Sequence, residues 1–330
     1  MMSDRLVRAP ARIGAFGMYV PRRVLTNSDF ERMFETSDEW IVQRTGIRTR
    51  HVVDENEYSS DLAIGAIDDL LAKNPGVDLR EVDYLIVNTT TPDYAYPSVA
   101  AMLQAHYDLP KSVGALDIAT ACAGFAYAIN LACGLIASGE CDRVLAIAAD
   151  ALTRSVDYTD RSTAVLFGDG GGVALIERSE TPRIFGMSHG SDGTGGRFLY
   201  RTGVRAEING EIDESRFLRQ NGREVYRWVL ENVPNDIERI LQRSGLTLDQ
   251  IDWFAPHSAN LRMIEALCKR IGFPLERTLL SVTEYGNTSA VSIPLALIPA
   301  VRDGRVKPGD RVLIMGFGGG LVTSGCVAVL

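Results

Sequence analysis

The chain has 330 residues, of which 46% are apolar and 23% charged, and its formal net charge is −8. A chain of this length is long for a single core, so we expect two domains or two fused halves. The negative charge argues against general nucleic-acid binding, because phosphate neutralisation needs an excess of Lys and Arg. We find no charge-free apolar stretch of about 18–20 residues and therefore expect no membrane insertion.

The cysteines and the N-terminal segment give information on the cellular compartment of the protein. The segment Met1–Arg12 is basic and has no apolar segment behind it, so it is not typical of a secretory signal. The five cysteines are scattered, without a C-x-x-C pair or a metal-ligand spacing. They indicate neither a metal site nor a disulfide framework, and we expect a reducing, cytoplasmic environment.

Short β-branched runs alternate with helical patterns along the chain. Strands are expected at Tyr84–Asn88, Gly114–Ile118, Arg143–Ala148, Val173–Ile176, Trp253–Pro256, Thr278–Ser281, Arg311–Met315 and Leu321–Val329. Helices are expected at Asp61–Lys73, Cys122–Ser138, Val225–Ser244, Asn260–Ile271 and Ala290–Asp303. This alternation predicts an α/β fold with mainly parallel sheets covered by helices. The second of these helices is rich in Ala, Gly, Leu and Ile, so it should be buried on all sides.

Two pairs of similar segments, here called echoes, recur along the chain. The segment around Asp83 resembles the one around Asp252, and the segment that begins at Asp142 is echoed at Asp310. The offset between the members of the second pair is only one position shorter than that of the first. Two echoes in nearly the same register predict a duplicated structural unit.

The duplication divides the chain into an N-terminal half, 1–178, and a C-terminal half, 179–330. The first half carries Cys122, and the second carries His257 and Asn287. The offset of the second echo, applied to Cys122, leads to Ala290, just past Asn287. Cys122 and Asn287 should therefore occupy roughly equivalent strand-to-helix turns. If the halves pack about a pseudo-two-fold axis, these turns and His257 can converge.

These three residue types suit thioester chemistry. Cys122 precedes a helix and has small neighbours, and the helix N-terminus should favour its thiolate. His257 follows a strand end and precedes a helix, which is a common place for catalytic groups. The turn around Asn287 would by itself indicate only a turn, and it gains weight from its register with Cys122. The remaining cysteines are interpreted as small core residues, namely Cys133, Cys141, Cys268 and Cys326.

Six segments together resemble the motifs of the β-ketoacyl-acyl-carrier-protein synthase III family. In chain order they are Thr36–Arg48, Thr120–Phe125, Asp157–Arg161, His257–Arg262, Gly286–Ala290 and Gly316–Gly320. The resemblance covers nearly the whole chain. It implies a thiolase-like, five-layered αβαβα fold made of two duplicated halves, and a homodimer.

The resemblance also implies an activity and the residues that perform it. An acyl-coenzyme A primer would acylate Cys122, and His257 and Asn287 would promote decarboxylative condensation with malonyl-acyl-carrier protein, initiating fatty-acid synthesis. The N–H groups of Cys122 and Gly319 would form the oxyanion hole. Coenzyme A enters as a thioester substrate, and no separate cofactor or metal is implied. The positions matching those that hold coenzyme A are Trp40, Arg44, Arg161, Gly222 and Asn260, and those matching the acyl pocket are Thr90, Tyr96, Leu152, Phe167 and Phe317, with Tyr96 reaching into the second subunit's pocket.

Docking of an acidic carrier protein to a net-negative enzyme requires a local basic face. We expect that face on the helix 260–271, where Arg262, Lys269 and Arg270 should be exposed, extended by Arg227. Apolar residues of the same helix should face inward, namely Leu261, Ile264, Leu267 and Ile271. A merely solvated helix face is the alternative.

Three departures from the family pattern leave the acyl specificity open. Ser258 follows the histidine where Gln is frequent, Tyr226 replaces a frequent Phe, and Gln220 replaces an apolar residue. A specialised condensing enzyme with a branched, dicarboxylic or secondary-metabolite primer is therefore an alternative. A degradative thiolase would carry a second Cys in the C-terminal glycine-rich loop, and an elongating synthase a second His in place of Asn287. A papain-like Cys-His-Asn hydrolase is a remote alternative, because it would not explain the duplicated unit.

Overall fold

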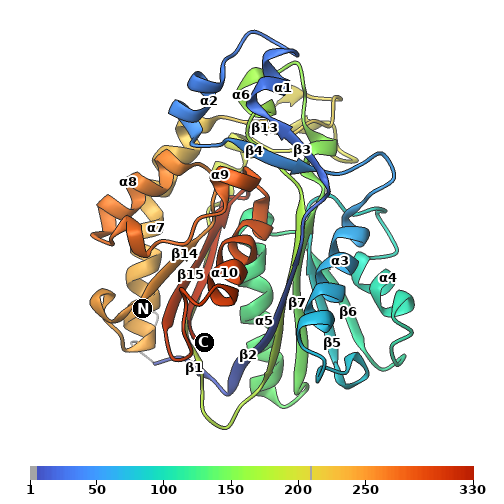
Figure 1. The fold of residues 1–330 in the computed structure, drawn as a ribbon, viewed down its shortest axis with the longest axis vertical. Helices are drawn as coiled ribbons and strands as arrows, with labels where there is room; N and C mark the ends of the chain where they lie inside the picture. The colour runs from blue at the N-terminus through green and yellow to red at the C-terminus, as the bar shows by residue number, and fades with distance from the viewer. Residues whose placement is uncertain (1–5, 209) are drawn as a thin grey trace.

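The computed structural model describes residues 6–208 and 210–330, so the first five residues of the basic segment Met1–Arg12 lie outside it. Two five-stranded sheets alternate with three layers of helices, which is the five-layered thiolase-like arrangement (Figure 1). The first sheet has the order β2 (Ala11–Tyr19), β8 (Gly170–Arg178), β7 (Arg143–Asp150), β5 (Tyr84–Asn88) and β6 (Gly114–Ile118). The second has the order β1 (Arg8–Ala9), β9 (Ile184–Ser191), β16 (Val322–Val329), β15 (Arg311–Gly318) and β14 (Trp253–Pro256).

The expectation of mainly parallel sheets is wrong. Strands β7, β5 and β6 are parallel to one another, as are β14 and β15, whereas the other neighbours in both sheets run antiparallel. Strand β16 follows β15 after only three residues, and so short a connection permits only an antiparallel return. Parallel pairs occur where a helix lies between the strands in the chain.

Within residues 6–208 and 210–330, helices form three layers around the two sheets. Helices α3 (Ser59–Lys73) and α4 (Val99–His106) share a core with the outer face of the first sheet. Helices α5 (Gly124–Ser138) and α10 (Ser292–Arg302) lie between the sheets, and α7 (Gly222–Ser244) and α8 (Leu261–Ile271) cover the outer face of the second (Figure 1). The expected helices are therefore confirmed, with shifts of a few residues at their ends.

The expected strand at Thr278–Ser281 is wrong. Only Thr278 forms a β-bridge there, parallel to Phe254 of β14. Its backbone N–H bonds to the carbonyl of Leu275, because it closes the 3₁₀ turn Leu275–Arg277, and a new helix begins at Val282. The N–H of Leu279 donates to the carbonyl of Phe254 at 2.7 Å, but that of Ser281 donates to Ser258 Oγ at 3.3 Å, so the pairing with β14 does not extend into a strand.

Helix α5 lies between the two sheets, as its composition predicts, but the expectation that it is buried on all sides is wrong, because Leu131 is 42% exposed. Its small side chains allow both sheets to approach closely, and its residues Phe125, Ala128, Ile129 and Ala132 are fully buried. The segment Ala121–Ser138 is long and apolar enough to cross a membrane by length and composition alone, so the expectation that the sequence has no such stretch is wrong. Here it is the central helix of the molecule, and its apolar surface contacts both sheets.

The two halves repeat local details at the register of the echo. Backbone amides at the start of β7 donate to Asp83 Oδ2, and the amide of Arg311 at the start of β15 donates to Asp252 Oδ2 at 2.7 Å. Ala121 and Ser289, which correspond in the register of the second echo, have the same left-handed backbone with φ of 45° and 54°. A boundary after residue 178 remains our proposal, supported by the change of sheet between β8 and β9.

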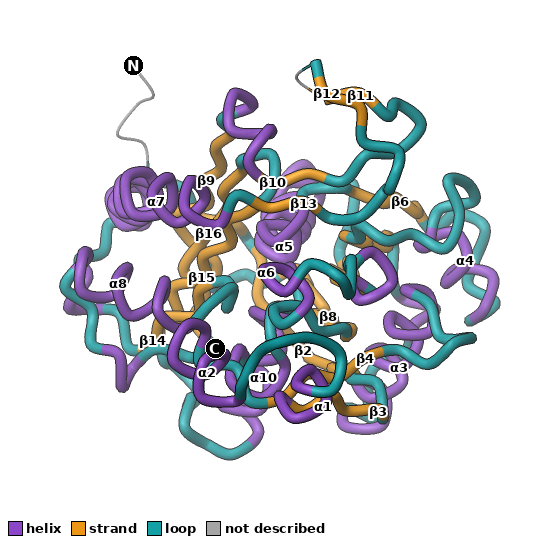
Figure 2. The backbone as a smooth tube through the Cα atoms, turned by 90° about the horizontal axis from the view of Figure 1, so that it is seen from above, coloured by secondary structure: helices purple, strands orange, loops and turns teal. Residues whose placement is uncertain are grey.

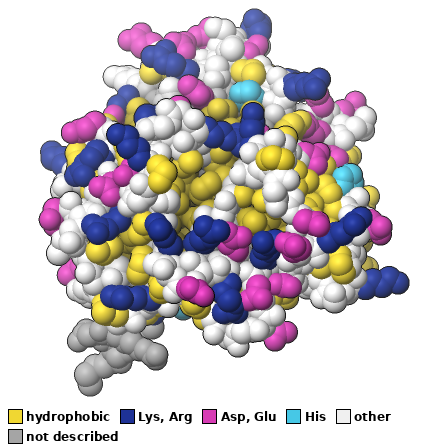
Figure 3. Space-filling view, turned by 60° about the horizontal axis from the view of Figure 1, so that its bottom comes forward, with side chains coloured by type: hydrophobic (Ala, Val, Ile, Leu, Met, Phe, Trp, Pro, Cys, Tyr) yellow, Lys and Arg dark blue, Asp and Glu magenta, His cyan; other side chains and the backbone are white. Residues whose placement is uncertain are grey.

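A cap of short elements covers one end of the sheets (Figure 1). It comprises β3 (Arg23–Thr26), α1 (Asn27–Glu31), α2 (Asp38–Thr45), β4 (Thr49–Val52), α6 (Arg161–Ala164) and α9 (Val282–Tyr285), beside the ribbon of β10 (Leu199–Tyr200) and β13 (Arg219–Gln220). The small hairpin of β11 (Glu207–Ile208) and β12 (Glu211–Ile212) projects from the body (Figure 2). At the end opposite the cap, acidic and basic side chains are interspersed around an apolar hollow, without a one-sign stripe on that face (Figure 3).

Candidate active site

Cys122 lies in the 3₁₀ turn Ala121–Ala123 that leads from β6 into α5. Asn88, at the end of β5, fixes this turn: its Nδ2 donates to the carbonyl of Ala121 at 3.2 Å, and its Oδ1 accepts from the amide of Thr120 at 3.1 Å. A side chain at Gly124 would overlap that amide group, since its Cβ would lie 1.8 Å from Asn88 Cγ. The residues around Cys122 are therefore small because the end of the neighbouring strand β5 occupies the space that larger side chains would need.

The end of β15 passes directly over this turn. A Cβ at Gly316 would lie 2.7 Å from Ala123 Cα, and a Cβ at Gly318 would lie 2.6 Å from Cys122 Cβ. Both distances are too short for any side chain, so glycine is required at both positions. The close approach brings the backbone of Gly319 to the thiol.

His257 follows β14 and is buried, with its backbone N–H bonded to the carbonyl of Met315 at 2.8 Å. Its Nδ1 lies 2.7 Å from Ser292 Oγ, which also accepts the backbone N–H of Ser258 at 3.1 Å. With that N–H already donating to it, the serine can give its own hydrogen to Nδ1. When Ser292 donates in this way, the neutral imidazole carries its hydrogen on Nε2. Phe317 packs edge-on against the ring with centroids 5.4 Å apart.

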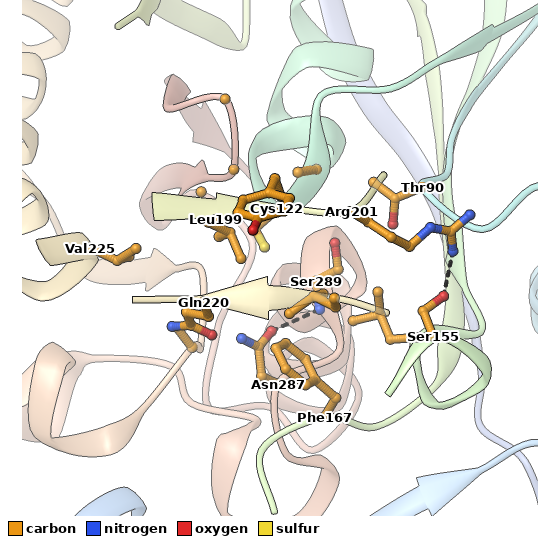
Figure 4. A pocket seen from close by; sticks show the side chains of 18 of the residues that line it. Thr90, Cys122, Ser155, Phe167, Leu199, Arg201, Gln220, Val225, Asn287 and Ser289 are labelled. Atoms are coloured by element: carbon orange, nitrogen blue, oxygen red, sulfur yellow. Dashed lines mark hydrogen bonds between the residues drawn. The ribbon is translucent and has the colours of Figure 1, made fainter. Parts of the chain in front are cut away.

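Asn287 is held by its backbone between two segments of the chain. Its N–H donates to the carbonyl of Leu166 at 2.8 Å, and its own carbonyl accepts from Gly168 at 3.1 Å. The side-chain Oδ1 accepts the backbone N–H of Ser289 at 3.0 Å, as drawn in Figure 4. Because that bond uses the oxygen, the amide's Nδ2 remains available as a donor.

Burial sets the charge state of both titratable residues. Desolvation raises the pKa of Cys122 to about 12, although hydrogen bonds from the Ser289 side chain and from the backbone N–H of Gly319 and Cys122 itself act in the opposite direction. Desolvation lowers the pKa of His257 to about 3, opposed by a backbone hydrogen bond with Ser289. The backbone N–H groups thus favour the thiolate, as expected, but burial outweighs them and keeps the pKa of Cys122 above its ordinary value. The resting pair is a thiol and a neutral imidazole.

Cys122, His257 and Asn287 line one cavity of about 410 Å³. Four of the five residues expected in the acyl pocket also line it, namely Thr90, Leu152, Phe167 and Phe317. The fifth, Tyr96, is 87% exposed and does not line this cavity. Figure 4 shows Cys122 between Val225 and Gln220 on one side and Thr90, Arg201 and Ser155 on the other.

Four of the residues expected to hold coenzyme A form one cluster. Two guanidinium groups lie near the Trp40 ring, with Cζ of Arg44 5.0 Å and Cζ of Arg161 4.9 Å from its centroid. Asn260 Nδ2 donates to the carbonyl of Arg44 at 3.2 Å, and its neighbour Ala259 lines the cavity. The fifth residue, Gly222, begins α7.

The basic residues expected to bind a carrier protein are exposed on α7 and α8. Arg262 is engaged by Glu265 at 2.9 Å and by backbone carbonyls of α2, and Arg227 pairs with Glu224. Lys269 and Arg270 form no ion pair within residues 6–208 and 210–330. The inward face differs slightly from the expected one: Met263, Ile264, Leu267 and Cys268 are buried, whereas Leu261 and Ile271 are half-buried.

Several residues of the site were not found from the sequence. Asn88 and Asp150 end the adjacent strands β5 and β7, and a polar residue closing an apolar strand was the signal that could have identified them. Asp150 is fully buried and accepts the N–H and the hydroxyl of Thr90 at 2.7 and 2.9 Å. Ser289 lies in a turn and Ser292 begins a helix. The sequence alone does not show which residues these two segments contact. Ser258, which stands where glutamine is frequent in the family, is buried and does not line the cavity.

Two stacked sheets around a central helix, with a cysteine at its start and a histidine and an asparagine lining the same cavity, define the class of thiolase-fold condensing enzymes. Residues 116–193 match the family model described as 3-oxoacyl-[acyl-carrier-protein] synthase III, and residues 241–330 match the C-terminal model of the same family. The chain belongs to the 3-oxoacyl-[acyl-carrier-protein] synthase III family, and it is a condensing acyltransferase of fatty-acid synthesis.

Individual relatives agree over almost the full length. The chain is 51% identical to β-ketoacyl-[acyl-carrier-protein] synthase III 2 of Bacillus subtilis, covering 96% of this chain and 97% of the relative. Its structure matches that of β-ketoacyl-[acyl carrier protein] synthase III from Thermus thermophilus with a TM-score of 0.93 and 44% identity, covering 97% and 99% of the two chains. The priming β-ketosynthase of the R1128 polyketide pathway is also similar, with a TM-score of 0.91, 33% identity, and coverage of 98% and 97%.

Proposed function

We propose that this chain condenses an acyl-coenzyme A primer with malonyl-acyl-carrier protein, releasing coenzyme A and CO₂ and forming 3-ketoacyl-acyl-carrier protein. The observation that carries the proposal is the presence of Cys122, His257 and Asn287 in one cavity at the start of the central helix. The names of the relatives agree with this reaction.

In the first half-reaction Cys122 Sγ attacks the thioester carbonyl of the primer. The C–S bond to coenzyme A breaks, and the thiol proton of Cys122 ends on the departing coenzyme A sulfur. The oxyanion formed at the carbonyl would be stabilised by the backbone N–H groups of Cys122 and Gly319, both of which act on the thiol in the resting enzyme. The product is an acylated cysteine, and the kinetics should be ping-pong.

In the second half-reaction the malonyl group loses CO₂, and its electron pair becomes an enolate at the carrier thioester. His257 Nε2–H and Asn287 Nδ2–H would donate to the enolate oxygen as its charge develops. Both donors are neutral, so neither gains nor loses a proton in this step. The enolate carbon then attacks the acyl group on Cys122, the C–S bond breaks, and the cysteine sulfur leaves as a thiolate that takes a proton from water to restore the resting thiol.

Coenzyme A would bind at the cluster of Trp40, Arg44, Arg161 and Asn260, together with Gly222 at the start of α7. The two guanidinium groups suit phosphate anions, and the Trp40 ring offers an aromatic surface to a base. A carrier protein would dock on the exposed basic residues Arg227, Arg262, Lys269 and Arg270. These surfaces adjoin the side of the cavity lined by α7 and α8.

The enzyme is proposed to act as a homodimer in the cytoplasm. Strand β6 is an edge of the first sheet, and Leu116 on it is 42% exposed. Tyr94 and Tyr96 are also exposed, at 59% and 87%. An unpaired edge with apolar neighbours suits pairing with a second copy, in which Tyr96 would reach the other subunit's acyl pocket.

The proposal is tested by intact-mass analysis after incubation with acyl-coenzyme A. We expect one thioester per chain, located on Cys122 by peptide mapping and absent from Cys122→Ala. Cys133→Ala is the matched control and should still be acylated. Acylation of another cysteine, or an unmodified wild-type chain with every acyl-coenzyme A tried, contradicts the proposal.

A further inference from the structure

The cavity has a polar end on the side of Cys122 that lies away from α7 and α8. Figure 4 shows Arg201, Ser155 and Thr90 together on that side, whereas Val225, from α7, lies on the other. The proposed coenzyme A cluster adjoins the cavity through Ala259 at the start of α8. An acyl chain on Cys122 that points away from coenzyme A therefore points toward Arg201.

Arg201 is anchored at this end by a hydrogen bond. Its Nη1 donates to Ser155 Oγ, and Ser155 is itself only 4% exposed. Arg201 itself is exposed, and no other hydrogen bond of its side chain occurs within the described part of the chain, so most of its five N–H donors are open to solvent and to a ligand. The Ser155 hydroxyl hydrogen also has no acceptor among the described residues.

No carboxylate neutralises this guanidinium. Arg201 forms no ion pair with the acidic residues that the structure describes, whereas Arg219, on the neighbouring strand, pairs with Asp213 and Asp157. The Thr90 hydroxyl already donates to Asp150, so it offers only acceptor capacity to a ligand. Among the side chains that line this end, the free donors are those of Arg201 and Ser155, whereas the buried Asp150 behind Thr90, whose Oδ2 has no partner among the described residues, does not line the cavity.

We propose that Arg201 and Ser155 form a subsite for a terminal carboxylate, so that the primer is a short dicarboxylic acyl group carried on coenzyme A. The inference rests on the proposed function, and it names the class of primer that the function leaves open. A carboxylate accepts hydrogen bonds from a guanidinium in a planar, charge-assisted geometry, and a serine hydroxyl can add a third bond.

An alkyl chain of the same length suits this end poorly. Its methyl terminus would displace water from Arg201 and Ser155 without replacing the lost hydrogen bonds, which costs binding free energy. A site built from hydrogen-bond donors discriminates strongly against an analogue that lacks the acceptor. The cavity is also lined by apolar side chains, Leu152 and Phe167 among them, which suit the methylene groups of either chain.

The test compares acylation rates for pairs of thioesters that differ only at the far end. Succinyl-coenzyme A and butyryl-coenzyme A share a four-carbon backbone, and glutaryl- and valeryl-coenzyme A share a five-carbon one. The rate constant for mass gain on Cys122, as kcat/KM, is measured for each. In the wild-type enzyme at least one pair should favour the dicarboxylic member.

Three variants separate charge from packing. Arg201→Met keeps the length and removes the charge, so it should lower the dicarboxylic-to-alkyl rate ratio at least about tenfold. Arg201→Lys keeps the charge and should retain most of the preference, and Ser155→Ala should give a smaller loss. A wild-type preference for the alkyl member in both pairs, or a ratio that Arg201→Met leaves unchanged, overturns the inference. Failure of all four thioesters to acylate Cys122 contradicts the proposed function instead.

Discussion

Burial of His257 removes the positive charge that a histidine would otherwise acquire below about pH 6.5. A cationic imidazole would also stabilise an enolate, but its desolvation in this cavity would cost several kcal/mol. The neutral ring, with its hydrogen on Nε2 through the contact with Ser292, donates without changing its protonation state. Asn287 supplies a second neutral donor with the same property.

Replacing either donor should separate the two half-reactions. We expect His257→Ala and Asn287→Ala to slow malonyl decarboxylation by at least about 10²-fold, the scale for losing one oxyanion donor. Both variants should still form acyl-Cys122, because neither donor touches the first oxyanion. CO₂ release and intact mass are the two measurements. Undiminished CO₂ release in both variants would remove the enolate role.

The depressed pKa of His257 also predicts a loss of stability in acid. Its pKa in the folded chain is about 3, below the ordinary value of 6.5, so its contribution is complete above pH 6.5 and declines as pH falls toward 3. Between pH 6.5 and about 4.5 the wild-type free energy of unfolding should fall by about 2–3 kcal/mol through this residue.

The matched variant is His257→Gln, which cannot titrate. Urea unfolding of both proteins at several pH values measures the difference, since other titrating groups are common to both. The stability of the wild type should decline more steeply than that of the variant. Parallel pH profiles would show that folding does not lower the pKa of His257.

At the level of elements, helix α8 combines structural and surface roles on its two faces. Its inner face packs on α7 and β14 through Met263, Ile264 and Leu267. On the outer face Arg262 is held by Glu265 and by α2, whereas Lys269 and Arg270 have no such partner among the described residues. We therefore expect the latter two to contribute most to any carrier docking.

Charge reversal at Lys269 and Arg270 tests whether these two residues bind the carrier protein. Lys269→Glu with Arg270→Glu should raise KM for malonyl-acyl-carrier protein strongly and leave acylation by acyl-coenzyme A almost unchanged. The effect should shrink as salt rises, because exposed charges are screened beyond about 10 Å at 0.1 M. Lys73→Glu with Arg80→Glu, on the opposite side of the molecule, is the matched control. Unchanged carrier kinetics at low salt would assign this face of α8 to solvent.

For the whole molecule, the free edge at β6 makes a specific prediction about assembly. The protein should be a dimer by light scattering, and Leu116→Lys should weaken it, because the change places a charge on a strand edge that the second copy would cover. Leu275→Lys, which alters an equally exposed leucine in the C-terminal half, should leave the dimer intact. A monomeric wild-type chain at micromolar concentration contradicts the proposal.

Much of this architecture could be read from the sequence, because it depends on local pattern and register. The strands Tyr84–Asn88 and Trp253–Pro256 and the central helix follow from apolar runs and small residues. The echo at Asp83 and Asp252 indicated the repeated unit. The motifs around Cys122, His257 and Asn287 indicated the family, since they combine residue types that thioester chemistry needs.

Tertiary structure decided what depends on neighbours distant in the sequence. Strand direction was one such case, because short connections and helical crossovers give similar apolar runs but opposite directions. The charge state of Cys122 was another: the helix N-terminus is a local feature, whereas the burial that outweighs it comes from β15 and the turn Ser289–Val291. The contacts of Ser292 with His257, and of Arg201 with Ser155, join segments 35 and 46 residues apart. Local pattern carries no information on such pairs, since the fold alone brings them together.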